Sequence, residues 1–313
     1  MADNTEIEWT DATWNPITGC SVVSPGCTNC YAMKLAGTRL KHIPSRAGLT
    51  RDSKAGPVWT GEVRFNHEWL DQPLRWRRPR MIFVCAHGDL FAEGVPDAWI
   101  DQVFAVMSQA PQHTFQVLTK RPERMREYLT RSQLGHQLVA ALIQFAFSVP
   151  EPGRWPHMPL PNVWLGVSVE DQKRANGRIP VLLDTPAAIR WISAEPLLGS
   201  LDVAWALSLN PLDIAAGLLA RGHFAPGLEK IRHLDWVVVG GESGHAARPM
   251  QPEWAESLRD QCAAAGVPFL FKQWGSHKQT SDCNGRYMIP ATKKEAGRLL
   301  DGIEHNGFPE VRR

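Results

Sequence analysis

Short apolar runs recur along this chain of 313 residues, and segments with helical patterning lie between them. Most of these runs are continuously apolar rather than alternating, which is typical of parallel strands that are buried on both faces. The predicted strands are Met81–Cys85, Phe115–Thr119, Val163–Val167, Ala188–Ser193, Trp236–Gly240 and Pro268–Lys272, with a weaker one at Ala12–Thr18. A repeated β-α order predicts a parallel sheet with right-handed crossovers.

The helices expected between the strands are Tyr31–Leu40, Asp97–Ser108, Pro122–Ser132, Asp171–Leu183 and Pro252–Ala265. Asp97 follows a proline and is a candidate N-cap, and Gly266 is a candidate C-cap. Six or seven β-α units predict an α/β fold built as a partial (β/α) barrel, and a doubly wound open sheet is the competing architecture.

Three long segments interrupt the β-α order, at residues 41–76, 135–161 and 200–233. Segments of this length are either functional loops or small added elements, so we interpret them as insertions in a barrel over residues 1–275. The second of them contains the Pro-rich connector Val149–Pro156. Residues 276–313 match no barrel unit and are predicted to form a C-terminal extension.

The composition narrows the class of protein. The formal net charge is only +2, so no overall basic field indicates a nucleic-acid partner. No apolar run is long enough to span a bilayer, and the N-terminus lacks a hydrophobic signal segment, which predicts a cytoplasmic protein without a membrane partner. The chain has 13 Trp against 3 Tyr, and a heavily aromatic core is the favoured explanation.

Three of the six cysteines lie close together, Cys20, Cys27 and Cys30, with the spacing C-x6-C-x2-C. Three thiolates are able to hold a [4Fe–4S] cluster by three of its irons and leave the fourth iron open. A structural zinc site needs four ligands, and neither His42 nor Cys85 completes a familiar finger spacing. Zinc, or cysteines without any ligand, remain the alternatives. Cys85 and Cys262 are interpreted as small buried apolar residues.

Polar or ionisable residues follow every predicted strand, where parallel α/β folds bind ligands. For any one of these residues, exposure of the loop to solvent explains its polar character. For the whole set, however, we expect a common site. The candidate catalytic residues are Lys120, Glu195, Glu242 and Lys272. We expect Lys120 and Lys272 to face the same cavity as the cysteines.

The cysteine motif after a first strand resembles the radical S-adenosylmethionine (SAM) superfamily, and the chain is most similar to a phage-associated family of uncharacterised three-cysteine proteins. The segments that carry this likeness are Thr13–Cys20, Cys27–Ala32, Leu118–Pro122, Gly240–Gly244, Phe271–Gly275 and Ala296–Gly302. The superfamily's usual pattern is C-x3-C-x2-C with an aromatic residue before the last cysteine. This chain has six residues in its first gap, and Tyr31 follows the last cysteine instead.

The resemblance implies a [4Fe–4S] cluster on the three cysteines, SAM bound to the open iron, and an electron donor as a partner. Reductive cleavage of SAM would then give a 5′-deoxyadenosyl radical that abstracts hydrogen from a substrate. The resemblance further implies that the SAM amino group lies near Gly88 and Asp89, and the ribose near Ser168 and Glu170. It places the adenine near the backbone of Gly240 and Gly241.

The most basic run of the chain bears on the substrate. Trp76 lies among four arginines in Arg75–Arg80, which suits a nucleotide or nucleic acid, although a solvated basic loop explains the run equally well. Two other classes stay open. One is a nucleic-acid-binding or sensor protein with a structural cluster or zinc, and the other is a non-radical barrel hydrolase that uses Asp89, Glu195 or Glu242.

Overall fold

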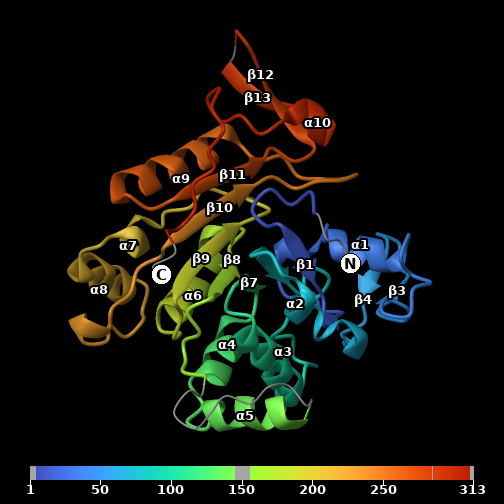
Figure 1. The fold of residues 1–313 in the computed structure, drawn as a ribbon. Coiled ribbons are helices and arrows are strands. Elements are labelled where there is room, and N and C mark those ends of the chain that lie inside the picture. Colours follow the sequence, from blue (N-terminus) through green and yellow to red (C-terminus); the bar gives the residue numbers. More distant parts are fainter. Residues whose placement is uncertain (1–4, 145–155, 284, 311–313) are drawn as a thin grey trace. The chain divides into compact units, whose positions relative to one another are not determined.

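The computed structural model describes residues 5–144, 156–283 and 285–310. It contains an α/β fold with a seven-stranded sheet (Figure 1). In spatial order the strands are β1 (Ala12–Trp14), β6 (Met81–Val84), β7 (Thr114–Thr119), β8 (Val163–Ser168), β9 (Ile189–Ala194), β10 (Trp236–Gly240) and β11 (Phe269–Gln273). The pairs β1–β6, β6–β7, β9–β10 and β10–β11 are parallel.

The strand order decides between the two predicted architectures. The strands lie in the sheet in the order in which the chain makes them. A doubly wound sheet would reverse its order at a switch point, whereas each unit of a (β/α) barrel adds its strand beside the previous one. The prediction of a partial barrel is therefore confirmed, and all six of the clear strand predictions fall on sheet strands.

The chain divides into two compact units. Unit 1 comprises residues 1–23, 30–165 and 185–188, and unit 2 comprises residues 24–29, 166–184 and 189–313. The predicted division into a barrel over residues 1–275 and an extension over residues 276–313 stays a prediction.

In unit 1, the weak strand predicted at Ala12–Thr18 is two strands. β1 joins the main sheet, whereas β2 (Ile17–Thr18) pairs antiparallel with β5 (Arg64–Phe65). Pro16 lies between them and has no N–H to continue a ladder, which is why the strand breaks there. A second small ladder joins β3 (Thr50–Arg51) to β4 (Val58–Trp59), so the insertion at 41–76 contains added elements.

The remaining elements of unit 1 are α1 (Tyr31–Gly37), η2 (His67–Trp69), α2 (Gln72–Arg75), α3 (Asp97–Gln109), α4 (Pro122–Leu129) and α5 (Leu134–Gln144). The predicted Asp97 cap is wrong, because Pro96 occupies the N-cap position and Asp97 is the first helical residue. The Asp97 carboxylate instead accepts hydrogen bonds from Arg124 and Arg131, each at 2.7 Å.

Unit 2 contains η1 (Pro25–Cys27), α6 (Gln172–Leu183), α7 (Ala204–Leu207), α8 (Pro211–Ala220), η3 (Leu228–Lys230) and α9 (Pro252–Ala265). β12 (His277–Asp282) and β13 (Gly285–Pro290) form an antiparallel hairpin, which α10 (Lys293–Ala296) follows. Asp171 caps α6 by accepting a bond from the Arg174 N–H. The predicted cap at Gly266 is confirmed, because this residue has φ of 67°.

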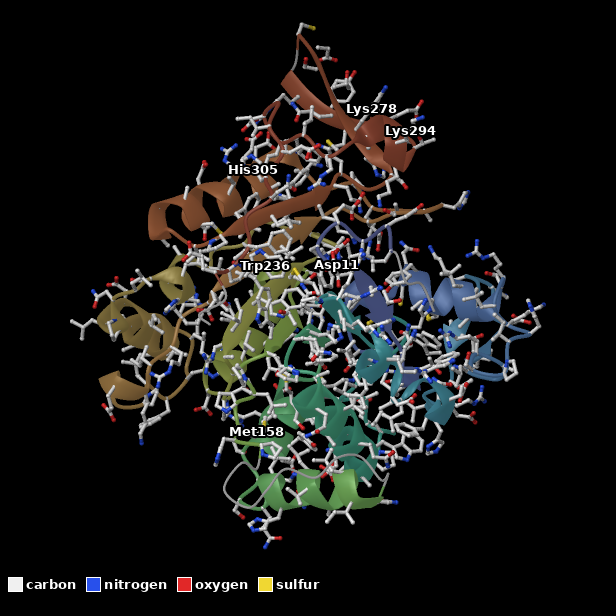
Figure 2. The ribbon with its side chains drawn as sticks, viewed as in Figure 1. Asp11, Met158, Trp236, Lys278, Lys294 and His305 are labelled. Atoms are coloured by element: carbon white, nitrogen blue, oxygen red, sulfur yellow. The ribbon has the colours of Figure 1, made fainter. Side chains whose placement is uncertain are left out.

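Tryptophans fill much of the core, as the composition indicated. Trp14, Trp164, Trp191 and Trp236 are among the largest fully buried side chains. In unit 2, the rings of Trp191 and Trp236 lie 5.3 Å apart, and a Cβ on Gly166 would collide with Trp191. Trp236, labelled in Figure 2, donates its indole N–H to the carbonyl of Gly307 at 2.7 Å.

The remaining predictions concern the Pro-rich connector and membrane-spanning segments. Most of the connector Val149–Pro156 lies outside the described residues. Over residues 5–144, 156–283 and 285–310, no helix has both the length and the apolar character that a membrane span requires.

Trp191→Ala should lower the free energy of unfolding by about 3–5 kcal/mol, because it opens a cavity beside Trp236 and Gly166. Urea unfolding monitored by circular dichroism measures this change. Phe224→Ala is the matched control, since this side chain is exposed. Equal losses in the two variants would contradict the packing described here.

Candidate functional site

The three clustered cysteines belong to different units. Cys20 and Cys30 lie in unit 1, and Cys27 lies in unit 2. None of the three forms a disulfide, and neither do Cys85, Cys262 and Cys283. Among the described residues, no three His, Cys, Asp or Glu side chains are grouped closely enough to hold a metal ion.

The backbone before Cys20 follows a path that only glycine allows. Gly19 has φ of +96°, and a Cβ at this position would lie 2.2 Å from the carbonyl oxygen of Glu62. Gly19 also forms an isolated parallel bridge with Gly88, and its N–H donates to the His87 carbonyl at 3.2 Å. The segment after β2 is thus fixed beside the segment after β6, and this contact sets the position of the Cys20 backbone.

Arg121, the second residue after β7, holds the Cys20 side chain. Its Nη1 donates to Cys20 Sγ at 3.4 Å and to the Asp89 carboxylate at 3.0 Å. Its Nη2 donates to the carbonyl and the hydroxyl of Ser21, and the same guanidinium pairs with Glu93. The Arg121 side chain is only 7% exposed. A buried cation therefore lies against the first cysteine of the motif.

The Asp89 carboxylate organises the ends of β6 and β7. One oxygen accepts from the Phe91 N–H and the Thr119 hydroxyl, and the other accepts from the Lys120 N–H and Arg121. The predicted meeting of these strand ends is confirmed within unit 1. Because all four bonds come from the protein, a ligand at Asp89 would have to displace one of them. Lys120 contributes its backbone N–H to this arrangement.

The charge on Arg121 is secured by its neighbours. Burial alone would lower the pKa of the guanidinium, but Asp89, Cys20 and Glu93 together raise this pKa above its ordinary value. Arg121 is therefore a permanent positive charge beside the sulfur. A guanidinium donor stabilises a thiolate more than a thiol, because the hydrogen bond to an ionised acceptor is the stronger one.

Cys30 occupies the N-cap position of α1, without a side-chain cap bond. Cys20 and Cys30 are both partly buried and pack against one apolar cluster, which comprises Ala32, Met33, Ala36, Leu49 and Trp59. This cluster covers one side of both thiols. In the same unit, burial and the charge of Arg46 lower the pKa of His87 to about 4, so this imidazole is neutral near pH 7.

In unit 2, Glu170 anchors the turn that carries Cys27. Its carboxylate is fully buried, accepts the Gly26 N–H at 3.2 Å and pairs with Arg178 at 2.9 Å. A Cβ on Gly26 would approach the Glu170 carboxyl carbon to 3.1 Å. Arg178 also donates to the Ser168 carbonyl, which ties the end of β8 to the same ion pair. Cys27 itself is buried.

Glu242, which follows β10, holds the other end of the same segment. It accepts a bond from Asn29 Nδ2 at 2.9 Å and is gripped by the backbone N–H and guanidinium of Arg248. Arg248 in turn donates to the Pro25 carbonyl at 2.9 Å. Burial favours the neutral acid, but the bonds from Arg248 and Asn29 keep the pKa of Glu242 below its ordinary value.

A third carboxylate in unit 2 is less enclosed. Glu195, at the end of β9, forms an ion pair with Lys272 of β11 at 2.5 Å. The two side chains are 19% and 16% exposed. Gly240 lies directly against this pair, since a Cβ there would come within 3.1 Å of the Glu195 carboxyl carbon. Two residues predicted to be catalytic are thus in direct contact.

Gly241, directly after β10, lies against the chain's own backbone. A Cβ on Gly241 would lie 2.0 Å from the Trp274 carbonyl oxygen. This close approach to the Trp274–Gly275 segment explains why glycine is needed at this position. That adenine lies near Gly240 and Gly241 stays a prediction.

Sequence reasoning did not assign roles to the arginines that hold this site. The position of Arg121 just after a predicted strand, in the segment Leu118–Pro122, did indicate a residue of the site. The positions of Arg178 and Arg248 gave no such indication, because they lie eight and six residues after the carboxylates that they pair with.

A comparison with protein families identifies the chain's relatives. A family model described as "Protein of unknown function (DUF5131)" matches residues 4–309. The chain belongs to this family. The match includes all three cysteines and the residues that hold them. No curated protein and no solved structure matches the chain.

In this DUF5131 protein, Arg121→Gln should lower the free energy of unfolding by about 3–5 kcal/mol, because it leaves the buried Asp89 carboxylate without its cation. Arg124→Gln, which breaks a more exposed pair with Asp97, should cost about 0–1 kcal/mol. Urea unfolding of both variants measures the difference. Similar losses would contradict the role assigned to Arg121.

The Glu242 contacts predict an acid-sensitive contribution to the stability of the DUF5131 fold. Because the folded-state pKa of Glu242 lies below its ordinary value of 4.5, its ionised form stabilises the protein above that pH. This contribution is lost as the pH falls through the folded-state pKa. Glu242→Gln should therefore be less stable than the wild type near pH 7, and the difference should shrink in acid.

Thermal unfolding between neutral and acidic pH tests this expectation. Glu123→Gln, on the exposed side of α4, provides the control and should follow the wild type at every pH. A difference between wild type and Glu242→Gln that stays constant with pH would show that the Glu242 carboxylate is not the titrating group.

Proposed function

We propose that this protein is a radical enzyme that binds a [4Fe–4S] cluster through Cys20, Cys27 and Cys30 and uses SAM. The main support is the Arg121 guanidinium, which donates to Cys20 Sγ at 3.4 Å from a buried position. A structural cysteine in a core needs no cation, whereas a thiolate that ligates a metal is stabilised by one.

The donor set fits this cofactor. Three soft sulfur ligands suit iron–sulfur chemistry, and none of the three cysteines is in a disulfide. The chain itself limits their separation, because residues three apart, such as Cys27 and Cys30, lie within about 11 Å even when fully extended. A bound cluster would supply an open iron for SAM and one electron for cleavage of its C–S bond.

The chain's own residues would orient and protect the cofactor. In unit 1, Arg121 places positive charge at the Cys20 sulfur, and the apolar cluster behind Cys20 and Cys30 excludes water from one side. In unit 2, Glu170 and Glu242 fix residues 24–29 from both ends. These carboxylates are engaged by protein donors, so in this proposal they position the cysteine segment.

Glu195 and Lys272 are the groups that we assign to the substrate. Their ion pair remains partly exposed at the ends of two parallel strands. Either member is able to exchange its partner for a polar group of a substrate, or to hold a proton on it. SAM itself would be bound mainly by backbone groups after β6 and β8, near Gly88 and Ser168.

The other hypotheses have less support. A hydrolase needs a carboxylate that is available to take a proton, but Asp89 and Glu242 each accept four hydrogen bonds from the protein. Of the three carboxylates considered for this role, that leaves Glu195, which is paired with Lys272.

For a nucleic-acid substrate, Trp76 is no stacking platform, since it is buried with Arg80 over its ring. Arg77 and Arg78, which are exposed, still favour a phosphate-bearing substrate. Reductive cleavage of SAM also requires an electron donor as a partner.

Anaerobic reconstitution with iron and sulfide should give about four irons per chain, and Cys20→Ala, Cys27→Ala and Cys30→Ala should each lose most of them. Cys262→Ala is the matched control, because burial raises the pKa of this thiol to about 12 and keeps it protonated. Colorimetric iron and sulfide assays give the readout. Equal iron in all four variants, or stoichiometric zinc instead of iron, would refute the cluster.

A second assay separates an enzyme from a sensor. The reconstituted protein, reduced with dithionite and given SAM, should release 5′-deoxyadenosine, and Cys20→Ala should release none. A protein that holds its cluster but leaves SAM intact would support the sensor hypothesis and contradict the proposed activity.

A further inference from the structure

Helix α8 is apolar on more sides than a surface helix should be. Its ten residues, Pro211–Ala220, include a single charged side chain, Asp213. Ile214, Gly217 and Leu218 form its buried face, and Trp205 packs against Gly217. A helix that is apolar all round normally has every face covered. The outer face of α8 is nevertheless open.

Large exposed apolar side chains form one stripe along the chain, on α8 and on the residues that flank it. Leu209, Leu212, Leu219 and Phe224 are between 60% and 87% exposed. They are four of the twelve large apolar side chains that are exposed in the described part of the chain, and they fall within sixteen residues. Leu212 and Leu219 are seven residues apart and so share one helix face. Concentrations of this kind mark interaction surfaces.

A groove of about 970 Å³ adjoins this stripe within unit 2. Its wall begins at Leu209 and Asp213 and continues onto α9. Small side chains at Ala204, Ala264 and Ala265 keep it open, while its acidic residues are Asp213, Glu253, Glu256 and Asp260. No lysine or arginine lines it. The surface is thus apolar along α8 and acidic beside it.

Nearby arginines reduce this charge only in part. Arg286 pairs with Glu253 and Glu256, and Arg259 pairs with Asp260 and Asp301. Five carboxylates therefore face two arginines, which leaves a net charge of −3. Asp213 is bound by the Ser208 hydroxyl rather than by a cation.

We propose that α8 and the adjoining groove form a docking surface for a basic amphipathic helix of another protein. Apolar side chains of that helix cover Leu212 and Leu219, and its lysines or arginines meet Asp213 and Asp260. Charge complementarity selects this occupant. A second copy of the chain in an isologous pair would bring the acidic groove against itself, which opposes association. An anionic lipid surface would be repelled for the same reason.

The test uses a labelled helical peptide of about 18 residues that contains only leucine and lysine, with leucines spaced for one face. Fluorescence anisotropy with the full-length protein should show saturable binding of one peptide per chain. Raising the salt concentration should weaken binding, because part of the attraction is electrostatic. A peptide of the same pattern with glutamate in place of lysine should not bind.

Variants locate the binding surface. Leu212→Glu/Leu219→Glu should weaken binding about tenfold or more, and Asp213→Lys should weaken it while reducing its salt dependence. Ile143→Glu, which changes another exposed apolar side chain, should bind like the wild type. If the double variant does not fold, as judged by circular dichroism, Phe224→Glu replaces it, since Phe224 is 87% exposed.

Four outcomes would overturn the proposal. They are equal binding by all variants, equal binding of the glutamate peptide, a homodimer in sedimentation that Leu212→Glu/Leu219→Glu abolishes, and recruitment to anionic vesicles that the same variant abolishes. The last two would assign the face to a second copy or to a lipid surface. The prediction does not depend on the cluster, so it is tested whether or not iron binds.

Discussion

Ion pairs between arginines and buried carboxylates hold the cysteine segments of this protein in place. In unit 1, Arg121 and Asp89 fix Cys20 from the ends of β6 and β7. In unit 2, the pairs Glu170–Arg178 and Glu242–Arg248 fix residues 24–29 through Gly26, Asn29 and Pro25. Each carboxylate would be costly to bury alone, so the pairs and their backbone donors have to form together.

The charged residues at the strand ends therefore have a structural role, and this role is compatible with a cofactor site. A site that binds a cofactor needs ligands held by a rigid surrounding layer, and buried charge pairs with backbone donors provide such a layer. The pairs contribute little net stability compared with apolar packing, but their hydrogen bonds have strict geometry. We infer that they set the position of the cysteines, while the tryptophan-rich core stabilises the sheet beneath.

The sequence predicted the sheet well for a clear physical reason. Strands buried on both faces must be continuously apolar, so Trp236–Gly240 and its counterparts were recognisable by composition alone. Errors arose where a local signal had two explanations. Asp97 matched an N-cap pattern, but its carboxylate serves Arg124 and Arg131 instead. Ala12–Thr18 looked like one strand, but Pro16 divides it between two ladders.

The site was predictable only in outline. Parallel topology implied that Asp89, Lys120 and Arg121 would meet, and they do within unit 1. What a carboxylate binds depends on residues brought to it by folding, and Arg178 and Arg248 carry no pattern that announces their pairing. The same limit applies to Gly241, whose close contact with the Trp274 backbone no sequence pattern indicated.

Mössbauer spectroscopy of the protein reconstituted with ⁵⁷Fe, recorded with and without SAM, tests the central claim most directly. Three cysteine ligands and one open iron predict a [4Fe–4S] spectrum in which about one quarter of the iron signal shifts when SAM is added. A spectrum that SAM leaves unchanged, or iron that does not assemble into a cubane at all, would contradict the account.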